Sequence, residues 1–311
     1  MMPRIVTTFP LPDAALELLR PLGSVGGPEG WRDALADAEA LLCLLTDRVD
    51  ADLLGRAPRL RIVANAVVGY EHVDRDACRA RGIAVTNTPD VLTDATADLA
   101  MALILSAARG LPQAERSLRA GRFNGWGFWD YLGADLHGRT LGIFGMGRIG
   151  KAVARRAAPF GMRVVYHSRT RHSAREEAAL GAEWVDFDGL IARSDVLSLH
   201  APLTPQTRHV IDADTLRRMQ PGSYLVNTAR GALVDEAALV DALRDGPLAG
   251  AGLDVYEREP ALHPGLLDLP NVTLLPHVGS ATRETRTRMA VLAARNVHAV
   301  LTGGPPLNPV P

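Results

Sequence analysis

One short segment near the middle of the chain constrains its fold more than any other. From Thr140 to Gly150 the sequence reads TLGIFGMGRIG, an apolar run that leads directly into a GxGxxG pattern. A helical pattern over 151–160 and a second apolar run over 162–166 follow it. A strand, a tight glycine turn and a helix start direct backbone N–H groups at a pyrophosphate. The segment therefore predicts a dinucleotide-binding βαβ unit, with cofactor contacts at Gly145, Gly147 and Gly150.

Strand-like and helix-like segments alternate on both sides of this motif. The first ninety residues contain short apolar runs at 4–9, 40–45, 60–68 and 83–86, separated by helical stretches such as 13–22. This alternation is typical of an α/β unit with a mostly parallel sheet. After residue 140 it resumes as one doubly wound domain, with further strands expected near Val164, Val196, Tyr224, Gly252 and Val272.

Two segments between these units have an unusual composition. A long helical pattern begins at Asp94 and is strongly apolar through Ala107, which indicates a buried helix or an oligomer contact. Residues 122–130 read RFNGWGFWD and hold two of the four tryptophans, so a packed loop is expected there. The last helical stretch covers 284–301, and we expect it to return to the first domain.

Composition excludes several classes of function. The 34 basic and 35 acidic residues leave a formal net charge of -1, which gives no excess that would favour nucleic acid or an anionic membrane. The start MMPRIVTTFP does not resemble a signal peptide, and no apolar run approaches a membrane span. Cys43 and Cys78 lack CxxC spacing, so neither a disulfide framework nor a metal site is expected. A cytoplasmic protein fits best.

The end of the second strand of the dinucleotide unit indicates which dinucleotide is bound. An acidic residue there would accept hydrogen bonds from the ribose hydroxyls of NAD, but the chain has Ser168, eighteen residues after Gly150. Ser168, Arg169 and Thr170, followed by Arg171, offer hydroxyls and charged donors that suit a 2′-phosphate. The pattern predicts a preference for NADPH; a solvated basic turn is the alternative.

Three ionisable residues stand after later strands, where α/β folds present ligands: Arg230 in VNTARG, Glu259 in VYEREP and His277 in LLPHVGSAT. Reduction of a ketone by hydride needs a proton donor, and His277 is suited to that role near neutral pH. Glu259 would hold the other imidazole nitrogen. Arg230 would clamp an adjacent carboxylate.

Each of the three has a structural explanation when taken singly, and only their joint occurrence after the glycine motif favours chemistry. Two further histidines remain open. His200, in SLHAPLT, stands at another strand end, where a structural role or a place near the nicotinamide is expected. His72, in VGYEHVD, is a second candidate for the site.

Six segments taken together resemble the D-2-hydroxyacid dehydrogenases, most closely their NADPH-dependent glyoxylate/hydroxypyruvate reductase branch. They are NAVVGYEHVD, VTNTPDVLTDATADLA, LGIFGMGRIG, VNTARGALVDE, AGLDVYEREP and LLPHVGSAT. The resemblance covers nearly the whole chain. It implies a flavodoxin-like substrate domain made of residues 1–97 plus 284–311 and a Rossmann domain of residues 98–283 inserted into it, with the active site in a hinged cleft between them.

The resemblance also implies roles for individual residues. Arg230 matches the substrate-binding arginine, Glu259 the relay glutamate and His277 the acid/base histidine. Val68 and Gly69 match a turn whose N–H groups hold the substrate carboxylate. The remaining cofactor positions that it implies, over the pyrophosphate, the phosphates or the nicotinamide, are Arg148, Ile149, Thr96, Thr228, Ala229, Asp254 and Gly279.

Further expectations follow from the same resemblance. Ser168 stands where NAD-dependent branches carry aspartate, which supports NADPH. The substrate is expected to be a small 2-oxo acid, glyoxylate or hydroxypyruvate. The protein is expected to form a homodimer joined by the nucleotide domains. Aromatic residues around Trp126 would close the substrate pocket, with simple packing as the alternative.

Two other readings of function stay open at this stage. Within the same fold the substrate could be D-lactate, 3-phosphoglycerate or phosphite, since fold does not decide among them. The loops of the N-terminal strands show no obvious basic cluster for a phosphorylated substrate. From a different class, relatives of such enzymes act as nucleotide-sensing interaction proteins, although this chain has no long disordered flank that would recruit a partner.

Overall fold

The computed structural model describes residues 4–310 and divides the chain into two compact units. One consists of Met1–Leu92 with Ser280–Pro311, and the other of Thr93–Gly279. The sequence boundaries at 97/98 and 283/284 therefore differ from the structural ones by a few residues. The first difference arises because helix α4 (Thr93–Arg109) packs along its length on the second unit, so the chain changes units where that helix begins.

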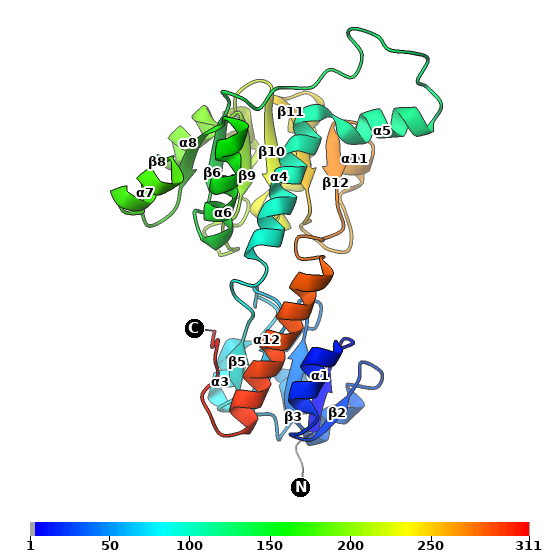
Figure 1. The fold of residues 1–311 in the computed structure, drawn as a ribbon, viewed down its shortest axis with the longest axis vertical. Coiled ribbons are helices and arrows are strands. Elements are labelled where there is room, and N and C mark those ends of the chain that lie inside the picture. Colours follow the sequence, from blue (N-terminus) through cyan, green and yellow to red (C-terminus); the bar gives the residue numbers. More distant parts are fainter. Residues whose placement is uncertain (1–3, 311) are drawn as a thin grey trace. The chain divides into compact units, whose positions relative to one another are not determined.

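The first unit is built on a five-stranded parallel sheet in the order β2-β1-β3-β4-β5 (Figure 1). Its strands are β1 (Arg4–Thr7), β2 (Ser24–Gly26), β3 (Ala38–Cys43), β4 (Ile62–Asn65) and β5 (Ala84–Thr86). Its helices are α1 (Asp13–Leu19), η1 (Asp33–Asp37), α2 (Ala51–Gly55), α3 (Arg75–Ala80) and α12 (Arg283–Leu301). This strand order is the flavodoxin-like one.

The end of the chain belongs to this first sheet. Helix α12 packs on α1, β3 and β4, and its buried residues Ala293 and Val297 join the core on that face. Beyond the helix the chain passes along β5, where Pro309 forms an antiparallel bridge with Thr86. The last helical stretch, expected over 284–301, thus returns to the N-terminal unit as expected.

The second unit has a seven-stranded parallel sheet in the order β12-β11-β10-β9-β6-β7-β8 (Figure 1). Its strands are β6 (Thr140–Phe144), β7 (Arg163–His167), β8 (Ala182–Trp184), β9 (Val196–Leu199), β10 (Ser223–Asn227), β11 (Leu248–Leu253) and β12 (Val272–Leu274). Besides α4, its helices are α5 (Leu111–Arg119), α6 (Arg148–Ala157), η2 (Ala158–Phe160), α7 (Ala174–Leu180), α8 (Phe187–Arg193), α9 (Ala213–Arg217), η3 (Gly231–Leu233), α10 (Glu236–Arg244) and α11 (Pro264–Leu267).

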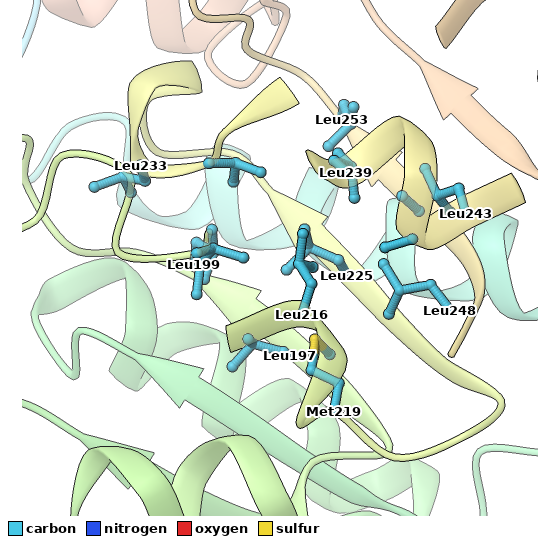
Figure 2. Close-up of a cluster of buried hydrophobic side chains, with 14 of the residues drawn as sticks. Leu197, Leu199, Leu216, Met219, Leu225, Leu233, Leu239, Leu243, Leu248 and Leu253 are labelled. Carbon is cyan, nitrogen blue, oxygen red and sulfur yellow. The ribbon is translucent and has the colours of Figure 1, made fainter. Parts of the chain in front are cut away.

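The chain enters this sheet in the middle, at β6, builds outward to β8 and then returns to build from β9 to β12. The order therefore reverses between β6 and β9, and ligands bind at such a switch point in doubly wound sheets. Helices cover both faces, and Figure 2 shows the leucine-rich core formed by Leu197, Leu225 and Leu253 from the sheet with Leu216 and Leu239 from α9 and α10. The predicted fold class, two doubly wound parallel α/β domains, is confirmed.

Local structure departs from the sequence-based expectation in three places. The long helical pattern from Asp94 is broken at Gly110, whose φ of 58° lies in the left-handed region, so α4 and α5 are separate helices. Strands β2 and β8 were not expected, because each has only three residues and lies at a sheet edge. Within residues 4–310, no helix combines the length and apolar character needed to span a membrane.

The expectation of a packed loop over 122–130 is wrong. Trp126 is 81% exposed and Trp129 is 76% exposed, and Phe128 makes edge-on contacts with both rings. These aromatic side chains contact one another rather than either hydrophobic core. By contrast, α4 is a buried helix, because Ala100, Leu103 and Ile104 all pack inside its own unit.

Candidate active site

His277 and Glu259 form a hydrogen-bonded pair in the second unit. The Nδ1 atom of His277 lies 2.8 Å from Oε2 of Glu259, and the two side chains are 33% and 27% exposed. The second carboxylate oxygen accepts a hydrogen bond of 2.9 Å from the backbone N–H of Tyr256. His277 itself has a φ of 54°, an uncommon conformation for a residue other than glycine. Both partners are thus held in fixed positions by the loops that follow β11 and β12.

The carboxyl group of Glu259 is ionised despite its partial burial. Burial by itself would raise the pKa of Glu259, but hydrogen bonds from His277 and from the Tyr256 N–H group, with the nearby charge of Arg230, bring that pKa below its usual range. The pair therefore places a carboxylate against Nδ1 of His277, so Nε2 is the imidazole nitrogen that Glu259 does not engage. Such a pair can hold a proton and deliver it.

Arg230 lies close enough to influence Glu259, and an asparagine that the sequence reasoning missed shapes its turn. Asn227, at the end of β10, is buried; its side chain accepts from the N–H of Ala229 at 3.0 Å and donates to the carbonyl of Arg230 at 2.8 Å. The next residue, Gly231, packs so tightly that a Cβ atom there would lie 1.8 Å from the carbonyl carbon of Tyr256. This contact joins the arginine turn to the loop that carries Glu259.

Tyr256 is a second residue that the sequence reasoning missed. It is 6% exposed, and its hydroxyl donates a hydrogen bond of 2.8 Å to the carbonyl of Leu275, just after β12. Burial raises the pKa of Tyr256 to about 12, so the phenol stays protonated and remains a donor. One tyrosine thereby links the segments of Glu259 and His277; the only signal in the sequence was its place within VYEREP.

Three predicted cofactor residues, Thr96, Asp254 and Gly279, are joined by hydrogen bonds just after His277 in the chain. The buried carboxylate of Asp254 accepts from the N–H groups of Val278 and Gly279 at 2.7 and 2.8 Å. The hydroxyl of Thr96 donates to the carbonyl of Gly279 at 3.3 Å. Asp254 therefore fixes the backbone just after His277. Burial raises the pKa of Asp254, against the lowering effect of these two N–H groups.

The glycine turn between β6 and α6 has the form that a pyrophosphate requires. A Cβ at Gly145 would lie 2.5 Å from the N atom of Ala201, and one at Gly150 would lie 2.4 Å from the carbonyl oxygen of Gly145. At Gly147 nothing lies within 4 Å of a Cβ, and no side chain caps α6 there. Gly145 and Gly150 permit close packing, while Gly147 leaves the N-terminus of α6 open to a phosphate.

The remaining predicted cofactor residues lie at the start of α6 and directly after β10. Arg148 and Ile149 form the first turn of α6. At the end of β10, Thr228 is 9% exposed and its hydroxyl has no hydrogen-bond partner among the described residues. An unsatisfied buried hydroxyl needs a partner, and a bound dinucleotide would supply one. The residues present thus fit a nicotinamide dinucleotide.

The basic segment after β7 contains two exposed arginines, one of which is paired with a carboxylate. Arg171 donates twice to Glu177, at 2.9 and 2.8 Å. Arg169 and Thr170 are exposed, and the Ser168 hydroxyl donates only to the carbonyl of Thr170, at 3.3 Å. Glu177 thus compensates Arg171, so Arg169 is the side chain of this segment best suited to an additional phosphate.

The Val68–Gly69 turn, which was predicted to bind substrate, follows β4 in the first unit. Both residues are half-buried, and their carbonyls accept hydrogen bonds from the side-chain amides of Asn87 and Asn65 in the same unit. His72 lies a few residues further on, and its carbonyl accepts from the N–H of Val49 at 2.9 Å. The structure therefore places His72 on a different unit from His277.

His200 lies close to a serine of the strand that precedes it. It follows β9, its Nε2 atom lies 2.8 Å from the hydroxyl of Ser198, and burial lowers the pKa of His200 to about 4. A neutral imidazole at working pH cannot serve as the proton donor. Among the described residues, no group of three or more His, Cys, Asp or Glu side chains could hold a metal ion.

Comparison with known proteins shows what this chain resembles. Residues 101–279 match the model of the D-isomer specific 2-hydroxyacid dehydrogenase NAD-binding domain. Glyoxylate reductase of Thermococcus litoralis is 46% identical over 99% of this chain and 96% of its own length. Glyoxylate reductase of Aeropyrum pernix is 48% identical over 98% and 95%. The structure of an NADPH-dependent glyoxylate/hydroxypyruvate reductase from Sinorhizobium meliloti, in complex with NADP and malonate, has a TM-score of 0.88 at 40% identity and covers 100% of this chain and 97% of that one.

The fold and the site define an NAD(P)-dependent oxidoreductase. The chain belongs to the D-isomer specific 2-hydroxyacid dehydrogenase family, as the six sequence segments indicated.

Proposed function

We propose that this enzyme is an NADPH-preferring reductase of small 2-oxo acids that converts glyoxylate to glycolate and hydroxypyruvate to D-glycerate. The observation that carries the proposal is the 2.8 Å pair of His277 and Glu259 beside Arg230 in a dinucleotide-binding unit. The names of the relatives, glyoxylate reductases at 43–48% identity, support the substrate class.

The chain's own residues would divide the work as follows. The reduced nicotinamide, when bound, supplies the hydride to the carbonyl carbon. His277 gives the proton on Nε2 to the carbonyl oxygen, so that the 2-oxo acid gains one hydride and one proton and becomes the 2-hydroxy acid. Glu259 stabilises the imidazolium before transfer and keeps the ring oriented. Arg230 and the N–H groups of Val68 and Gly69 hold the substrate carboxylate.

Cofactor contacts follow the same division. The open N-terminus of α6, with Gly147, Arg148 and Ile149, would receive the pyrophosphate. Ser168, Arg169 and Thr170 would hold the 2′-phosphate of NADPH, because they present hydroxyls and an exposed guanidinium where an acidic residue would repel it. Thr96, Thr228, Ala229, Asp254 and Gly279 would lie near the phosphates or the nicotinamide.

The deciding experiment measures loss of reduced-nicotinamide absorbance with glyoxylate, hydroxypyruvate and pyruvate, and its gain with phosphite, D-lactate and 3-phosphoglycerate, with both cofactors. We expect kcat/KM for glyoxylate or hydroxypyruvate to be the highest, and NADPH to be preferred over NADH by about tenfold or more. A higher value with D-lactate, 3-phosphoglycerate or phosphite would reassign the substrate. Tight NADPH binding without turnover of any acid would favour the nucleotide-sensing alternative.

We also propose a homodimer. Leu111 and Leu118 on α5 are 51% and 60% exposed, and the aromatic segment 122–132 continues the same apolar stretch of chain. Exposed apolar surface of this extent is typical of an interface, and a second copy would cover it. Light scattering should give twice the chain mass, and the double variant Trp126→Ser with Trp129→Ser should shift the mass towards the monomer. A monomeric wild type would contradict this.

A cytoplasmic location completes the proposal. Cys43 and Cys78 are both free and buried, and burial raises the pKa of both thiols, which suits a reducing compartment. Cell fractionation followed by immunoblotting would test the location, and recovery of the protein outside the cytoplasm would overturn it.

A further inference from the structure

The Val68–Gly69 turn is held by the segment that follows β5. The side-chain amide of Asn87 donates a hydrogen bond of 2.8 Å to the carbonyl of Val68, and the N–H of Thr88 donates one of 3.1 Å to the carbonyl of Val67. Because a peptide group is planar, a carbonyl that is fixed also fixes the direction of the N–H on the following residue. Asn87 therefore orients the N–H of Gly69, and Thr88 orients the N–H of Val68.

A second asparagine supports the same turn from β4. Asn65 is fully buried, and its side-chain amide donates to the carbonyl of Gly69. The three successive carbonyls of Val67, Val68 and Gly69 are thus all occupied by donors from the body of the unit. With its carbonyls engaged in this way, the turn offers its N–H groups to an anion.

The segment of Asn87 is in turn held by the end of the chain. The N–H of Asn87 donates to the carbonyl of Asn308 at 3.2 Å, and the N–H of Val310 donates to the carbonyl of Val85 at 2.9 Å. Residues 307–310, which we call the C-terminal clamp, run antiparallel to β5 through the bridge between Thr86 and Pro309.

One buried side chain fastens the C-terminal clamp to α12. Asn296 is 0% exposed, and its oxygen accepts from the N–H groups of Leu307 and Asn308 at 3.0 and 2.9 Å. Its nitrogen donates to the side-chain oxygen of Asn308 at 3.0 Å and to the carbonyl of Leu292 at 2.9 Å. All of its polar atoms are used, so a continuous chain of hydrogen bonds runs from α12 through the clamp to Asn87 and the turn.

We propose that Asn87 is a positioning residue for the substrate carboxylate and that the C-terminal clamp, fastened by Asn296, keeps Asn87 in place. The proposal rests on the proposed function, which assigns the N–H groups of Val68 and Gly69 to that carboxylate. Asn87 acts only through the turn. The carboxylate is the same in substrate and transition state, so the loss of its support should weaken binding of both equally and raise KM with little change in kcat.

The test compares steady-state kinetics of Asn87→Ala, Asn296→Ala and the double variant in the full chain, with glyoxylate and saturating NADPH. We expect Asn87→Ala to raise KM about 5- to 30-fold, with kcat within about twofold of wild type and NADPH affinity unchanged. Asn296→Ala should raise KM less. In the double variant KM should equal that of Asn87→Ala within about twofold, because both changes act through one route.

Arg81→Met is the matched control. Arg81 also links side chain to backbone in this unit, donating to the carbonyls of Leu54 and, at 2.9 Å, of Ala57, and neither acceptor belongs to the turn or to the clamp. It should lower the melting temperature without changing KM. If Asn296→Ala fails to fold, Val310→Pro, which removes the N–H that donates to Val85 and leaves Asn296 intact, takes its place with the same expected rise in KM.

The outcomes separate this inference from the function on which it rests. Wild type that reduces no 2-oxo acid would overturn the proposed function and this inference with it. An active wild type whose KM is unchanged in Asn87→Ala would overturn the inference alone. Two results would show that the C-terminal clamp acts only on general stability. One is a KM in the double variant that rises by the product of the two single effects. The other is a rise in KM for Arg81→Met equal to that for Asn296→Ala.

Discussion

The Nδ1 atom of His277 lies 2.8 Å from Oε2 of Glu259, although the two residues follow different strands, β12 and β11, of the nucleotide-binding sheet. The pairing leaves Nε2 as the nitrogen that we propose donates the proton. Tyr256 connects the two loops, because its N–H donates to Glu259 and its hydroxyl donates to the carbonyl of Leu275. The dyad is therefore preformed within one folding unit, and its chemistry can be tested by single substitutions.

Replacing His277 should affect turnover far more than cofactor binding. His277→Asn removes the proposed proton donor while Gly145, Gly147 and Gly150 remain intact, so kcat with glyoxylate should fall about 10²- to 10⁴-fold. The dissociation constant for NADPH, measured by fluorescence titration, should change by less than about twofold. Comparable losses in both quantities would mean that His277 has only a structural role.

Replacing Glu259 separates charge from geometry. Glu259→Gln keeps an oxygen that can accept from Nδ1 of His277 but removes the negative charge that stabilises the imidazolium, so kcat should fall roughly 10- to 100-fold. Glu257→Gln is the matched control, because Glu257 pairs with Arg208 and His209 instead. If Glu257→Gln lowered kcat as much as Glu259→Gln, the relay role of Glu259 would be wrong.

Cofactor preference should depend on Arg169 more than on its basic neighbours. Arg169→Asp places a negative charge where the 2′-phosphate is expected, so KM for NADPH should rise about 10- to 100-fold while KM for NADH changes little. Arg175→Asp is the matched control, because it makes the same charge change at a second exposed arginine, which lies on α7. An unchanged ratio of the two KM values in Arg169→Asp would refute the NADPH assignment.

Acid should destabilise the fold partly through His200. Burial holds the pKa of this imidazole at about 4, below its usual 6.5, so between these values the unfolded chain binds a proton that the folded chain does not. This contribution to stability is present above about pH 6.5 and is lost as pH falls towards 4. In urea unfolding at pH 7.5 and 5, His200→Gln should lose less stability than wild type, whereas the exposed His298→Gln should behave like wild type.

The close approach at Gly231 should tolerate no side chain. Gly231→Ala would bring a Cβ within 1.8 Å of the backbone of Tyr256, so the turn of Arg230 and the loop of Glu259 must separate. We expect a loss of about 1–3 kcal/mol in unfolding free energy and a fall in kcat. Gly55→Ala, where nothing lies within 4 Å, is the control for chemical denaturation. Equal stability of the two variants would contradict the contact.

Much of the fold could be predicted from the sequence, because its signals are local. The glycine pattern at 140–150 and the alternation of apolar runs with helical patterns depend on residues close together in the chain. The short edge strands β2 and β8 were not predicted, because three residues are too few to show a periodic pattern of apolar side chains. The aromatic segment 122–130 was expected to pack, since a sequence shows that side chains are apolar but not whether anything covers them.

The sequence alone determined that a dinucleotide fold is present and which residue types stand after its strands: Arg230, Glu259 and His277. Only the tertiary structure decided how they are used. It brought Glu259 to one imidazole nitrogen, tied Arg171 to Glu177, and joined the Asn87 side chain to the carbonyl of Val68 and the Asn296 side chain to the C-terminal clamp. Hydrogen bonds between distant segments depend on how strands are ordered in a sheet, and that order is a property of the whole folded chain.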